Sequence, residues 1–593
     1  MSAVPAGLRS ASNEPAFADR PPFAPFPSLM TMLLRLLFAV LLATPLSAQE
    51  DKSFVHQFGA PGTTGSFRVH FVKEGAGAWF VQSTDHWTTL AAARAFAAAQ
   101  EKGVAPTSGD YLMLAFHGDD HALRLALPTA TAAFPVDPAV APWRVATTPE
   151  QVTFTLDAGN GLVLEKVLTH DAKQRGFQLA IVLRNGNSQA TGSLDLVLGG
   201  PALVVPHQTG LLLSATGGLA AVAEGDPQHV TPKAGPAQPL TIDGRTLLFA
   251  GTSNRFFGAF VWPRDDGARA ALRSCEVDTV PLRDDEVSGT MANTTLRARY
   301  GLSLPIPAAG GESRATFGLY LGPKSFRVFA TLPEPERFAP VLDVDLNSPC
   351  CGGITVPGGR PMAKLLLWLL GKFHDLIGNW GVAIMMLTIL VRGLLAPVNF
   401  HMQKSMRAYS ARMAVLKPKL DALKTKFGDD QRGYQQAMIQ FQREHKMLPP
   451  LGGCLPIFLT MPIYLGLFTA LRTAYDVRQM PFVGWIDDLS RPDALFALPF
   501  WPEQFNLLPL LWIALMIVQM LKQPLPTDPQ QRQQMQIMRY MPLIFGVMLY
   551  TYAAALLVYM VTSMLWTFVE SAVTKRILGP IDPNVAAMTP QTF

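Results

Sequence analysis

The residue of this chain that most needs a chemical explanation is Arg392, which lies inside the apolar run MMLTILVRGLLAPV, residues 385–398. The apolar character begins at Trp380, so the run is long enough to cross a bilayer. An arginine at the centre of a bilayer costs about 2.5–3.5 kcal/mol on insertion scales. Two explanations are therefore possible. Either the Arg392 side chain reaches the polar interface, or it belongs to a buried site that uses its positive charge.

Both explanations have consequences that the sequence can address. Snorkelling from Arg392 to the end of the run at Val398 would span six helical residues, about 9 Å. Glu570 is the only acidic residue in the other apolar stretches, and it lies near the end of the last one. A hydrated polar groove among the helices is the remaining way to hold the charge. The polar side chains that could line this groove are Thr388, Gln519, Tyr559 and Thr567.

A charged groove without a catalytic pair favours handling of a polypeptide or ions over bond chemistry, so we expect no enzyme. The histidines of the first half are scattered, show no carboxylate pair at a suggestive spacing, and are interpreted as surface residues; they are His56, His117, His121, His207 and His229. The cysteines Cys275, Cys350, Cys351 and Cys454 form no CxxC or Cys/His pattern, so no metal or other cofactor is expected. Cys275 could pair with Cys350 or Cys351 in an oxidising compartment, or all could be free thiols.

The elements that must position Arg392 are apolar stretches in the second half of the chain. Only 16% of the residues of the chain are charged and its mean hydropathy is +0.20, as expected if part of it lies in lipid. The four apolar stretches are 380–398, 448–471, 504–521 and 540–569. The last one has 30 uncharged residues, about 45 Å of helix against a hydrocarbon core of about 30 Å. It fits two spans with a tight turn near Ala553-Ala554-Ala555, which gives five spans in all.

Loop charges predict the orientation of these spans. Residues 399–447 carry ten Lys/Arg and four Asp/Glu, whereas residues 472–503 carry three Lys/Arg and five Asp/Glu. The positive-inside rule places the first loop in the cytoplasm and the second outside. Lys575 and Arg576 also favour the inside, so the carboxyl terminus is predicted to be cytoplasmic. Residues 361–378 are amphipathic and predict a helix on the outer membrane surface.

The cytoplasmic loop itself shows helical heptads. Apolar residues step by three and four from Met406 to Phe427 and again from Tyr434, with Gly428-Asp429-Asp430 between them. This pattern predicts an antiparallel helical hairpin, with Pro418 kinking its first arm. The hairpin is either a simple connector or a docking surface, and its positive charge would suit ribosomal RNA or anionic lipid headgroups.

The first half of the chain predicts an all-β sandwich. Short alternating segments are broken by turn residues, as in residues 177–200, which indicate two strands around an RNGN turn. Residues 30–50 have the pattern of a secretory signal peptide, either cleaved or retained as an anchor. We therefore divide the chain into a leader or incorrectly assigned start (1–29), the signal segment (30–50), a β-sandwich domain (51–350), an interfacial helix (361–378), a five-span core (379–575) that includes the hairpin (399–447), and a tail (576–593).

Several motifs resemble the YidC/Oxa/Alb membrane protein insertases, in the Gram-negative form with a large periplasmic domain. They are GNWGVAIMMLTILVRGLLAPV (378–398), LGGCLPIFLTMPIYLGLF (451–468), RQMPFVGWIDDLS (478–490), MRYMPLIFGV (538–547), GTSNRFFGAFVWP (251–263) and YLGPK (320–324). The resemblance covers 361–575 most specifically. It departs at Ala553-Ala554-Ala555, where the family has a Pro-Ser-Gly turn, in the non-basic tail, and in the short amino-terminal apolar segment.

The resemblance implies a five-helix core with a hydrophilic groove for the polar end of an inserting segment, and a β domain with the family's supersandwich fold. Arg392 would be the groove charge, with Thr388, Tyr559 and Thr567 lining the groove. The apolar part of the substrate would slide past Met461, Pro462, Tyr464 and Pro542. The implied function is an inner-membrane insertase and chaperone for nascent membrane proteins, working alone or with the Sec translocon and ribosome, in contact with lipids and without recognition of a nucleic-acid sequence. The alternatives are a secondary transporter or channel with Arg392 as its substrate site, and an anchored carbohydrate-binding protein.

Overall fold

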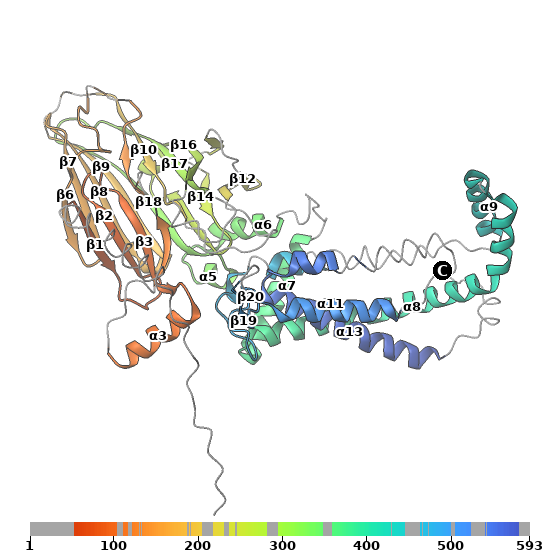
Figure 1. Ribbon diagram of the computed structural model, residues 1–593. Helices are drawn as coiled ribbons and strands as arrows, with labels where there is room; N and C mark the ends of the chain where they lie inside the picture. Colours follow the sequence, from red (N-terminus) through yellow and green to blue (C-terminus); the bar gives the residue numbers. More distant parts are fainter. Residues whose placement is uncertain are drawn as a thin grey trace, which may run out of the picture. The chain divides into compact units, whose positions relative to one another are not determined.

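Figure 1 shows the computed structural model of the chain, in which an all-β half precedes a helical half. The residues that the structure describes are 52–579 except 104–110, 117–120, 130, 132, 187–188, 190, 204–216, 224, 231–236, 243–245, 282–293, 348–358, 429, 445–462, 465, 472–473, 500–503, 523–539 and 541–542. The predictions for the leader, the signal segment, most of the tail, and Cys350, Cys351 and Cys454 lie outside these residues.

The all-β half contains three sheets. The four-stranded sheet has the order β1-β2-β3-β4, with β1 (Ser53–Phe58), β2 (Phe67–Val72), β3 (Ala78–Trp87) and β4 (Tyr111–Phe116). The five-stranded sheet has the order β13-β16-β17-β10-β5, with β5 (Leu125–Ala126), β10 (Ser193–Gly199), β13 (Gln238–Leu240), β16 (Leu272–Pro281) and β17 (Thr294–Pro305). The nine-stranded sheet has the order β12-β11-β14-β15-β18-β9-β8-β7-β6, with β6 (Arg144–Thr148), β7 (Gln151–Asp157), β8 (Leu162–Asp171), β9 (Gly176–Asn185), β11 (Gly217–Val222), β12 (Gln228–Val230), β14 (Leu247–Ser253), β15 (Phe257–Pro263) and β18 (Glu312–Pro323).

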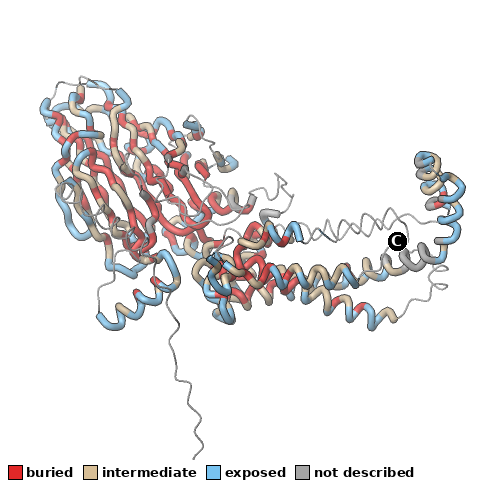
Figure 2. Tube along the Cα trace, viewed as in Figure 1, coloured by how far each residue is buried: buried red, intermediate tan, exposed pale blue. Residues whose placement is uncertain are grey.

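The prediction of an all-β domain is confirmed, and its core follows from the alternation of the strands. Along β8, buried residues alternate with partly exposed ones, as expected for a sheet with one covered face. Leu164 of β8 pairs with Leu183 of β9, and both are fully buried. Figure 2 shows this buried interior extending along the strands of the large sheet. Cys275 lies in the same core as a free thiol, and burial raises the pKa of this thiol.

The strands predicted around the RNGN turn form, but they do not pair with each other. β9 lies in the nine-stranded sheet between β8 and β18, whereas β10 pairs with β17 and β5 in the five-stranded sheet. The alternation along a strand shows which face is buried but not which neighbour completes the backbone hydrogen bonds. The chain therefore crosses between sheets where a local hairpin was predicted.

Short helices complete this half. The first of them follows Thr89, whose side chain caps it by accepting a hydrogen bond from the Ala92 amide at 3.1 Å. The helices are α3 (Leu90–Glu101), η2 (Ala172–Gln174), α4 (Asp266–Ala271), α5 (Phe326–Phe329), η3 (Pro335–Phe338) and α6 (Ala339–Asn347).

Lys166 of β8 is a buried lysine in the sandwich core, and it is only 2% exposed. Its Nζ donates hydrogen bonds to the carbonyl oxygens of Leu123, at 2.8 Å, and of Ala76, and lies 4.8 Å from the ring centroid of Phe154. Burial lowers the pKa of Lys166 to about 7. The ammonium is thus held by neutral partners, and the folded state binds this proton less tightly than the unfolded chain.

Lys166 should make the stability of the β domain depend on pH. Between pH 7 and about pH 10 the unfolded chain binds more protons at this site, so the free energy of unfolding should rise with pH. Relative to a Lys166→Met variant, which cannot titrate there, the full-length wild type should gain stability across this range. Denaturant unfolding of the two proteins at pH 6, 7.5, 9 and 10 measures the difference. A difference that stays constant from pH 7 to pH 10 would contradict the assignment.

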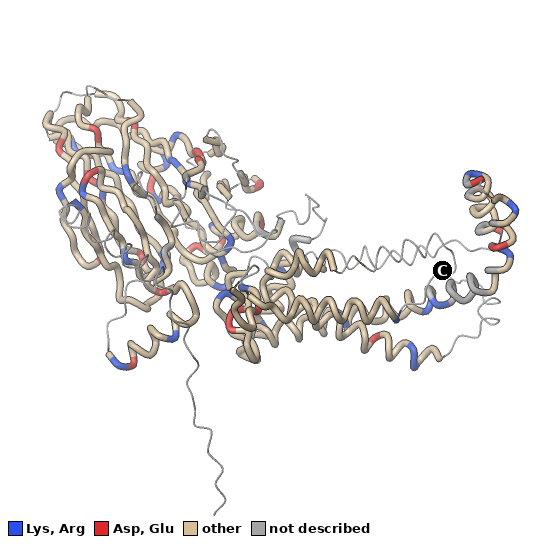
Figure 3. Tube along the Cα trace, in the orientation of Figure 1, with Lys and Arg blue, Asp and Glu red and all other residues tan. Residues whose placement is uncertain are grey.

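The helical half supports the predicted apolar helices, although the described residues do not establish all five spans. Two helical segments are long and apolar enough to cross a membrane, Trp380–Ser405 and Ala554–Leu578, and Leu507–Leu521 is a shorter apolar helix. The elements of this half are α7 (Gly359–Ile377), α8 (Trp380–Phe427), α9 (Gln431–Glu444), η5 (Tyr475–Val477), β19 (Phe496–Ala497), β20 (Gln504–Phe505), α11 (Leu507–Leu521) and α13 (Ala554–Leu578). Figure 3 shows that charged residues are sparse along α11 and most of α13 and more frequent in the second part of α8 and in α9.

The Arg392 span and the first arm of the hairpin form one helix. α8 begins after Gly378, whose positive φ of 77° ends α7, and Asn379 caps it by accepting from the Val382 amide at 3.1 Å. The helix continues through Pro397 and Pro418 and ends at Phe427 before Gly428, which has φ 48°. The arm that precedes the turn is therefore an extension of the span.

The turn before α13 lies at residues 550–553, next to the predicted Ala553-Ala554-Ala555 position. Residues 543–549 are helical, and the amides of Ala554 and Ala555 donate to the carbonyls of Arg491 and Leu489 at 2.7 and 2.8 Å. The loop 474–499 thus satisfies amides that a helix amino terminus leaves unpaired. Buried alanines, without larger side chains, allow this close backbone contact.

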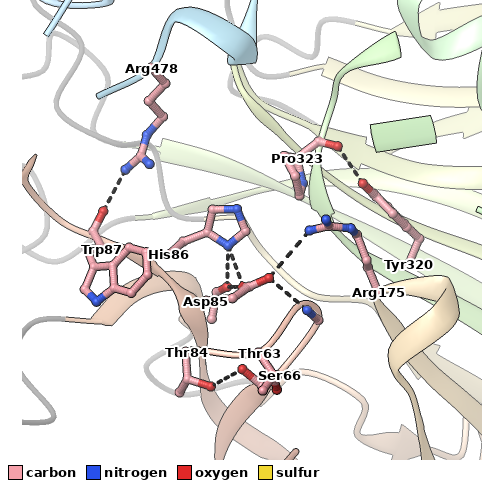
Figure 4. A network of polar contacts seen from close by, with 12 residues as sticks. Thr63, Ser66, Thr84, Asp85, His86, Trp87, Arg175, Tyr320, Pro323 and Arg478 are labelled. Atoms are coloured by element: carbon pink, nitrogen blue, oxygen red, sulfur yellow. Dashed lines mark hydrogen bonds and ion pairs between the residues drawn. The ribbon is translucent and has the colours of Figure 1, made fainter. Parts of the chain in front are cut away.

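The same loop contacts the β domain around a buried Asp85–His86 pair (Figure 4). Burial alone would raise the pKa of Asp85, but His86 and hydrogen bonds from Ser83 and the Gly65 amide lower it to about 2. Arg478 and Gln479 of the loop both donate to the Trp87 carbonyl at 2.9 Å. These contacts join the strand end of β3 to the segment that follows η5.

Candidate functional site

Arg392 is held between helices by hydroxyl groups. Its Nε donates to Ser563 Oγ of α13 at 2.9 Å, and its terminal nitrogen donates to both Ser563 Oγ and Tyr464 Oη. The guanidinium also lies 5.2 Å from the ring centroid of Tyr464, within range of a cation–π interaction. Among the described residues no carboxylate forms a salt bridge with Arg392, so its positive charge is solvated by neutral groups but not cancelled.

Tyr559 completes what we call the Arg392 cluster, which consists of Arg392, Tyr464, Tyr559 and Ser563. Tyr559 is 6% exposed, and it lies beside Tyr464 and Ser563. The two tyrosine rings meet at an angle of 60° with centroids 5.9 Å apart. The cluster thus draws on α8, α13 and the helical residues around Tyr464, which precede η5.

The cluster depends on the register of α8 against α13. The two helices run side by side in the same direction (Figure 1), and Arg392 meets a residue 171 positions later in the chain. The same offset relates Asn399 to Glu570, whose side chains lie beside each other. Between these two pairs, the Trp566 ring lies near Gly393, at 3.9 Å from the place that a Cβ would take there, which is an ordinary van der Waals distance. The parallel pair therefore brings polar residues together at intervals of seven along both helices.

The predicted lining residues lie on three helices. Thr388 is 1% exposed and its hydroxyl donates to the Ile384 carbonyl at 2.7 Å, within its own helix. Thr567 likewise donates to the Ser563 carbonyl at 2.9 Å. Gln519 of α11 has a buried Oε1 without a hydrogen-bond partner in the described part of the chain. The structure thus brings Tyr559 beside Tyr464, which contacts Arg392, while the threonine hydroxyls satisfy backbone carbonyls.

The positions predicted for the hydrophobic slide are mostly outside the described residues, namely Met461, Pro462 and Pro542. Tyr464 is described, and it contacts Arg392 and Tyr559. Its position is therefore at the Arg392 cluster, and its role in a slide stays a prediction.

Sequence reasoning missed Ser563. It sought an acidic partner for Arg392, because opposite charge is the usual signal for a buried pair. A single serine in an apolar helix gives no comparable signal. Polar residues at equal spacing along the two helices would have been a useful indication. Thr388 and Tyr559 are 171 positions apart in the chain, as are Arg392 and Ser563.

The histidines predicted to lie on the surface need a correction where they are described. His229 is exposed, but His56 and His121 are only partly exposed, and Nε2 of His56 is buried without a hydrogen-bond partner among the described residues. His117 and His207 lie outside the described residues. In the described part of the chain no three His, Cys, Asp or Glu residues come together as metal ligands.

Removing the Ser563 hydroxyl should destabilise the helical half. Ser563→Ala leaves guanidinium N–H groups without their acceptor, at a cost of about 1–3 kcal/mol. Thr562→Val is the matched control, because the Thr562 hydroxyl donates only to the Val558 carbonyl of its own helix. Thermal unfolding of the purified proteins in detergent should show a larger loss for Ser563→Ala. In an Arg392→Met background this excess should disappear, and its persistence would contradict the assigned contact.

The fold and the Arg392 cluster define a protein with a large all-β domain and a set of apolar helices that holds one positive charge. A family profile described as 60Kd inner membrane protein matches residues 372–580. A protein of Neisseria gonorrhoeae named "Membrane protein insertase YidC" is 30% identical over 432 residues, which are 71% of this chain and 71% of that protein. The chain belongs to the YidC/Oxa/Alb family of membrane protein insertases.

Other similar proteins have the same name. The protein from Neisseria meningitidis serogroup C is 35% identical over 308 residues, covering 52% of this chain and 49% of that protein, so the match spans about half the length of this relative. A solved structure described as "Active YidC insertase crystal structure with the first transmembrane domain resolved" aligns with 91% of this chain and 99% of that one. Its identity is 17% and its TM-score 0.32, so the family assignment rests on the sequence relatives.

Proposed function

We propose that this chain inserts integral membrane proteins into the bacterial inner membrane and helps them fold. The observation that carries the proposal is the Arg392 cluster, which keeps an uncancelled positive charge on an apolar helix. Such a charge attracts the polar or acidic end of a polypeptide without forming a covalent bond, so the chain acts as a chaperone and not as an enzyme. The family relatives, which are named insertases, favour this function over a transporter or channel.

The membrane position of the helices is supported by their exposed apolar residues. Leu394 is 79% exposed, Val547 72% and Val569 54%, and such residues are suited to contact with lipid. We infer a core of five spans, in which the stretches at 448–471 and 504–521 and the two parts of 540–574 accompany the span at Trp380. Arg392 lies in a groove of this core, which Thr388, Gln519, Tyr559 and Thr567 line. The slide comprises Met461, Pro462, Tyr464 and Pro542.

The orientation follows from loop charges and is supported by the contacts of the β domain. Arg478 and Gln479 bind the Trp87 carbonyl, and Ser325 Oγ donates to both carboxylate oxygens of Asp476, at 2.8 and 2.9 Å. These contacts support a β domain and a loop 474–499 on the same side of the membrane. We infer that this side is the periplasm, and that the hairpin and the carboxyl terminus lie in the cytoplasm.

The partners in this proposal are nascent membrane proteins, lipids, the Sec translocon and the ribosome. The hairpin of α8 and α9 carries the basic surface suited to docking on the cytoplasmic side. Depletion of the protein in its source bacterium, followed by quantification of newly made membrane proteins, tests the function. We expect short membrane proteins with small translocated ends to fail first and to recover when the wild-type chain is restored. Unchanged insertion of the membrane proteome after complete depletion would contradict the proposal.

A further inference from the structure

A second polar pair lies beyond the Arg392 cluster on the same two helices. Asn399 and Glu570 each follow a cluster residue, Arg392 and Ser563, by seven positions, which is about 10 Å along a helix. Both are 9% exposed, and the Asn399 side chain lies beside the Glu570 carboxylate. The parallel register of α8 and α13 therefore places the Glu570 carboxylate toward the carboxyl end of α13, about 10 Å along the helices from Arg392 of α8.

The Glu570 carboxylate has unused capacity to accept a hydrogen bond or a cation. Its Oε1 is buried without a hydrogen-bond partner in the described part of the chain. Lys575 and Arg576, the next basic residues of α13, are exposed and form no salt bridge with Glu570 in the described structure. Arg392 acts on Glu570 only as a distant charge. A carboxylate among apolar helices is costly unless a cation approaches it, so this position favours a positively charged ligand.

We infer that Glu570 is a specificity-determining residue that binds the lysine or arginine flanking an inserting span on its cytoplasmic side. Membrane spans retain such basic residues on that side, and Glu570 lies toward the end of α13 that carries Lys575 and Arg576. Arg392 and Glu570 then attract flanking residues of opposite charge, at sites about 10 Å apart along the helices. This inference rests on the proposed insertase function and adds a second charge site to it.

Binding of the incoming cation breaks no covalent bond and needs only a small rearrangement of side chains around Glu570. Asn399 uses one part of the carboxylate, and the free Oε1 offers the ammonium or guanidinium group an acceptor. Because Glu570 lies about two turns before the end of α13, a side chain can reach it from the cytoplasmic side while the apolar span contacts lipid. A charge-assisted hydrogen bond of this kind is stronger than one between neutral groups.

The test uses the full-length protein in vesicles of zwitterionic lipid, so that lipid charge does not attract the substrate. Two substrates share one apolar span and a neutral translocated end, and differ only in a Lys-Lys or Gln-Gln cytoplasmic flank. With the wild type, protease protection of the translocated end should be several-fold higher for the Lys-Lys substrate. Glu570→Gln should lower it to the level of the Gln-Gln substrate, which itself should be unchanged. Thr574→Val, on the same buried face but uncharged, should preserve the difference.

Reversing the charge of residue 570 gives a second measurement, so that the test does not depend on Glu570→Gln alone. Glu570→Lys should insert a substrate with a Glu-Glu flank several-fold better than the wild type does. Equal losses for both flanks with Glu570→Gln, or no loss for either, would overturn the inference, as would failure of Glu570→Lys to favour the acidic flank. If the wild type inserts neither substrate, the proposed function itself fails, and this result is distinct from a wild type that inserts both substrates equally.

Discussion

Insertion of substrates with acidic translocated ends should fall by tenfold or more in an Arg392→Ala variant. The structure gives the reason, because the guanidinium is held by the Ser563 and Tyr464 hydroxyls, which leave its charge free to attract a carboxylate. A charge near a low-dielectric wall acts more strongly than one in bulk water. A tenfold change corresponds to about 1.4 kcal/mol, well within the range of one such interaction.

Three substitutions of Arg392 distinguish the contribution of its positive charge from that of the guanidinium shape. Arg392→Lys should retain a substantial part of the activity, since the ammonium keeps the charge but cannot make all the guanidinium contacts. Arg392→Glu should lose insertion of acidic-ended substrates at least as fully as the alanine variant. Substrates with neutral ends should be much less affected by all three changes. Normal insertion of acidic-ended substrates by Arg392→Ala would show that Arg392 only snorkels to the interface.

Removal of the helical hairpin, residues 402–447, should abolish most insertion while leaving the core folded. The hairpin is a self-contained element, because α8 ends at Phe427 and α9 runs from Gln431 to Glu444. It lies beyond the Arg392 cluster along α8, so the contacts with Ser563 and Tyr464 can form without it. Its ten basic residues, against four acidic ones, within 399–447 give it the charge expected of a docking surface.

The test measures both the membrane level and the insertion activity of the protein that lacks the hairpin. The shortened protein should accumulate in the membrane near the wild-type level and unfold at a similar temperature in detergent. In the insertion assay it should lose most activity toward ribosome-bound nascent chains. A matched variant that keeps the hairpin but replaces Lys417, Lys419, Lys424 and Lys426 with glutamine should show a partial loss. Full activity without the hairpin would reduce it to a simple connector.

The sequence predicted the elements that have strong local patterns. The amphipathic stretch at 361–378 corresponds closely to α7, and the glycine at 428 marks the end of α8. Strand alternation indicated the all-β half, because a sheet with one buried face requires it. These features depend on neighbouring residues alone, so a single sequence contains them.

Contacts between distant residues could not be predicted in this way. The pairing of Arg392 with Ser563, which lies 171 residues later in the chain, depends on the register of two helices. Lys166 is held by the carbonyls of Ala76 and Leu123, and any residue type can supply a carbonyl oxygen. The placement of β9 and β10 in different sheets likewise depends on their partners and not on their own patterns.

The most direct test of the central claim is insertion by the purified chain alone. The full-length wild type is reconstituted into vesicles, a short membrane protein with an acidic translocated end is synthesised outside them, and the protease-protected fraction of that end is measured. The account predicts a protected fraction several-fold above that of protein-free vesicles and of vesicles with Arg392→Ala at the same protein density. A protected fraction equal to that of protein-free vesicles would contradict the account.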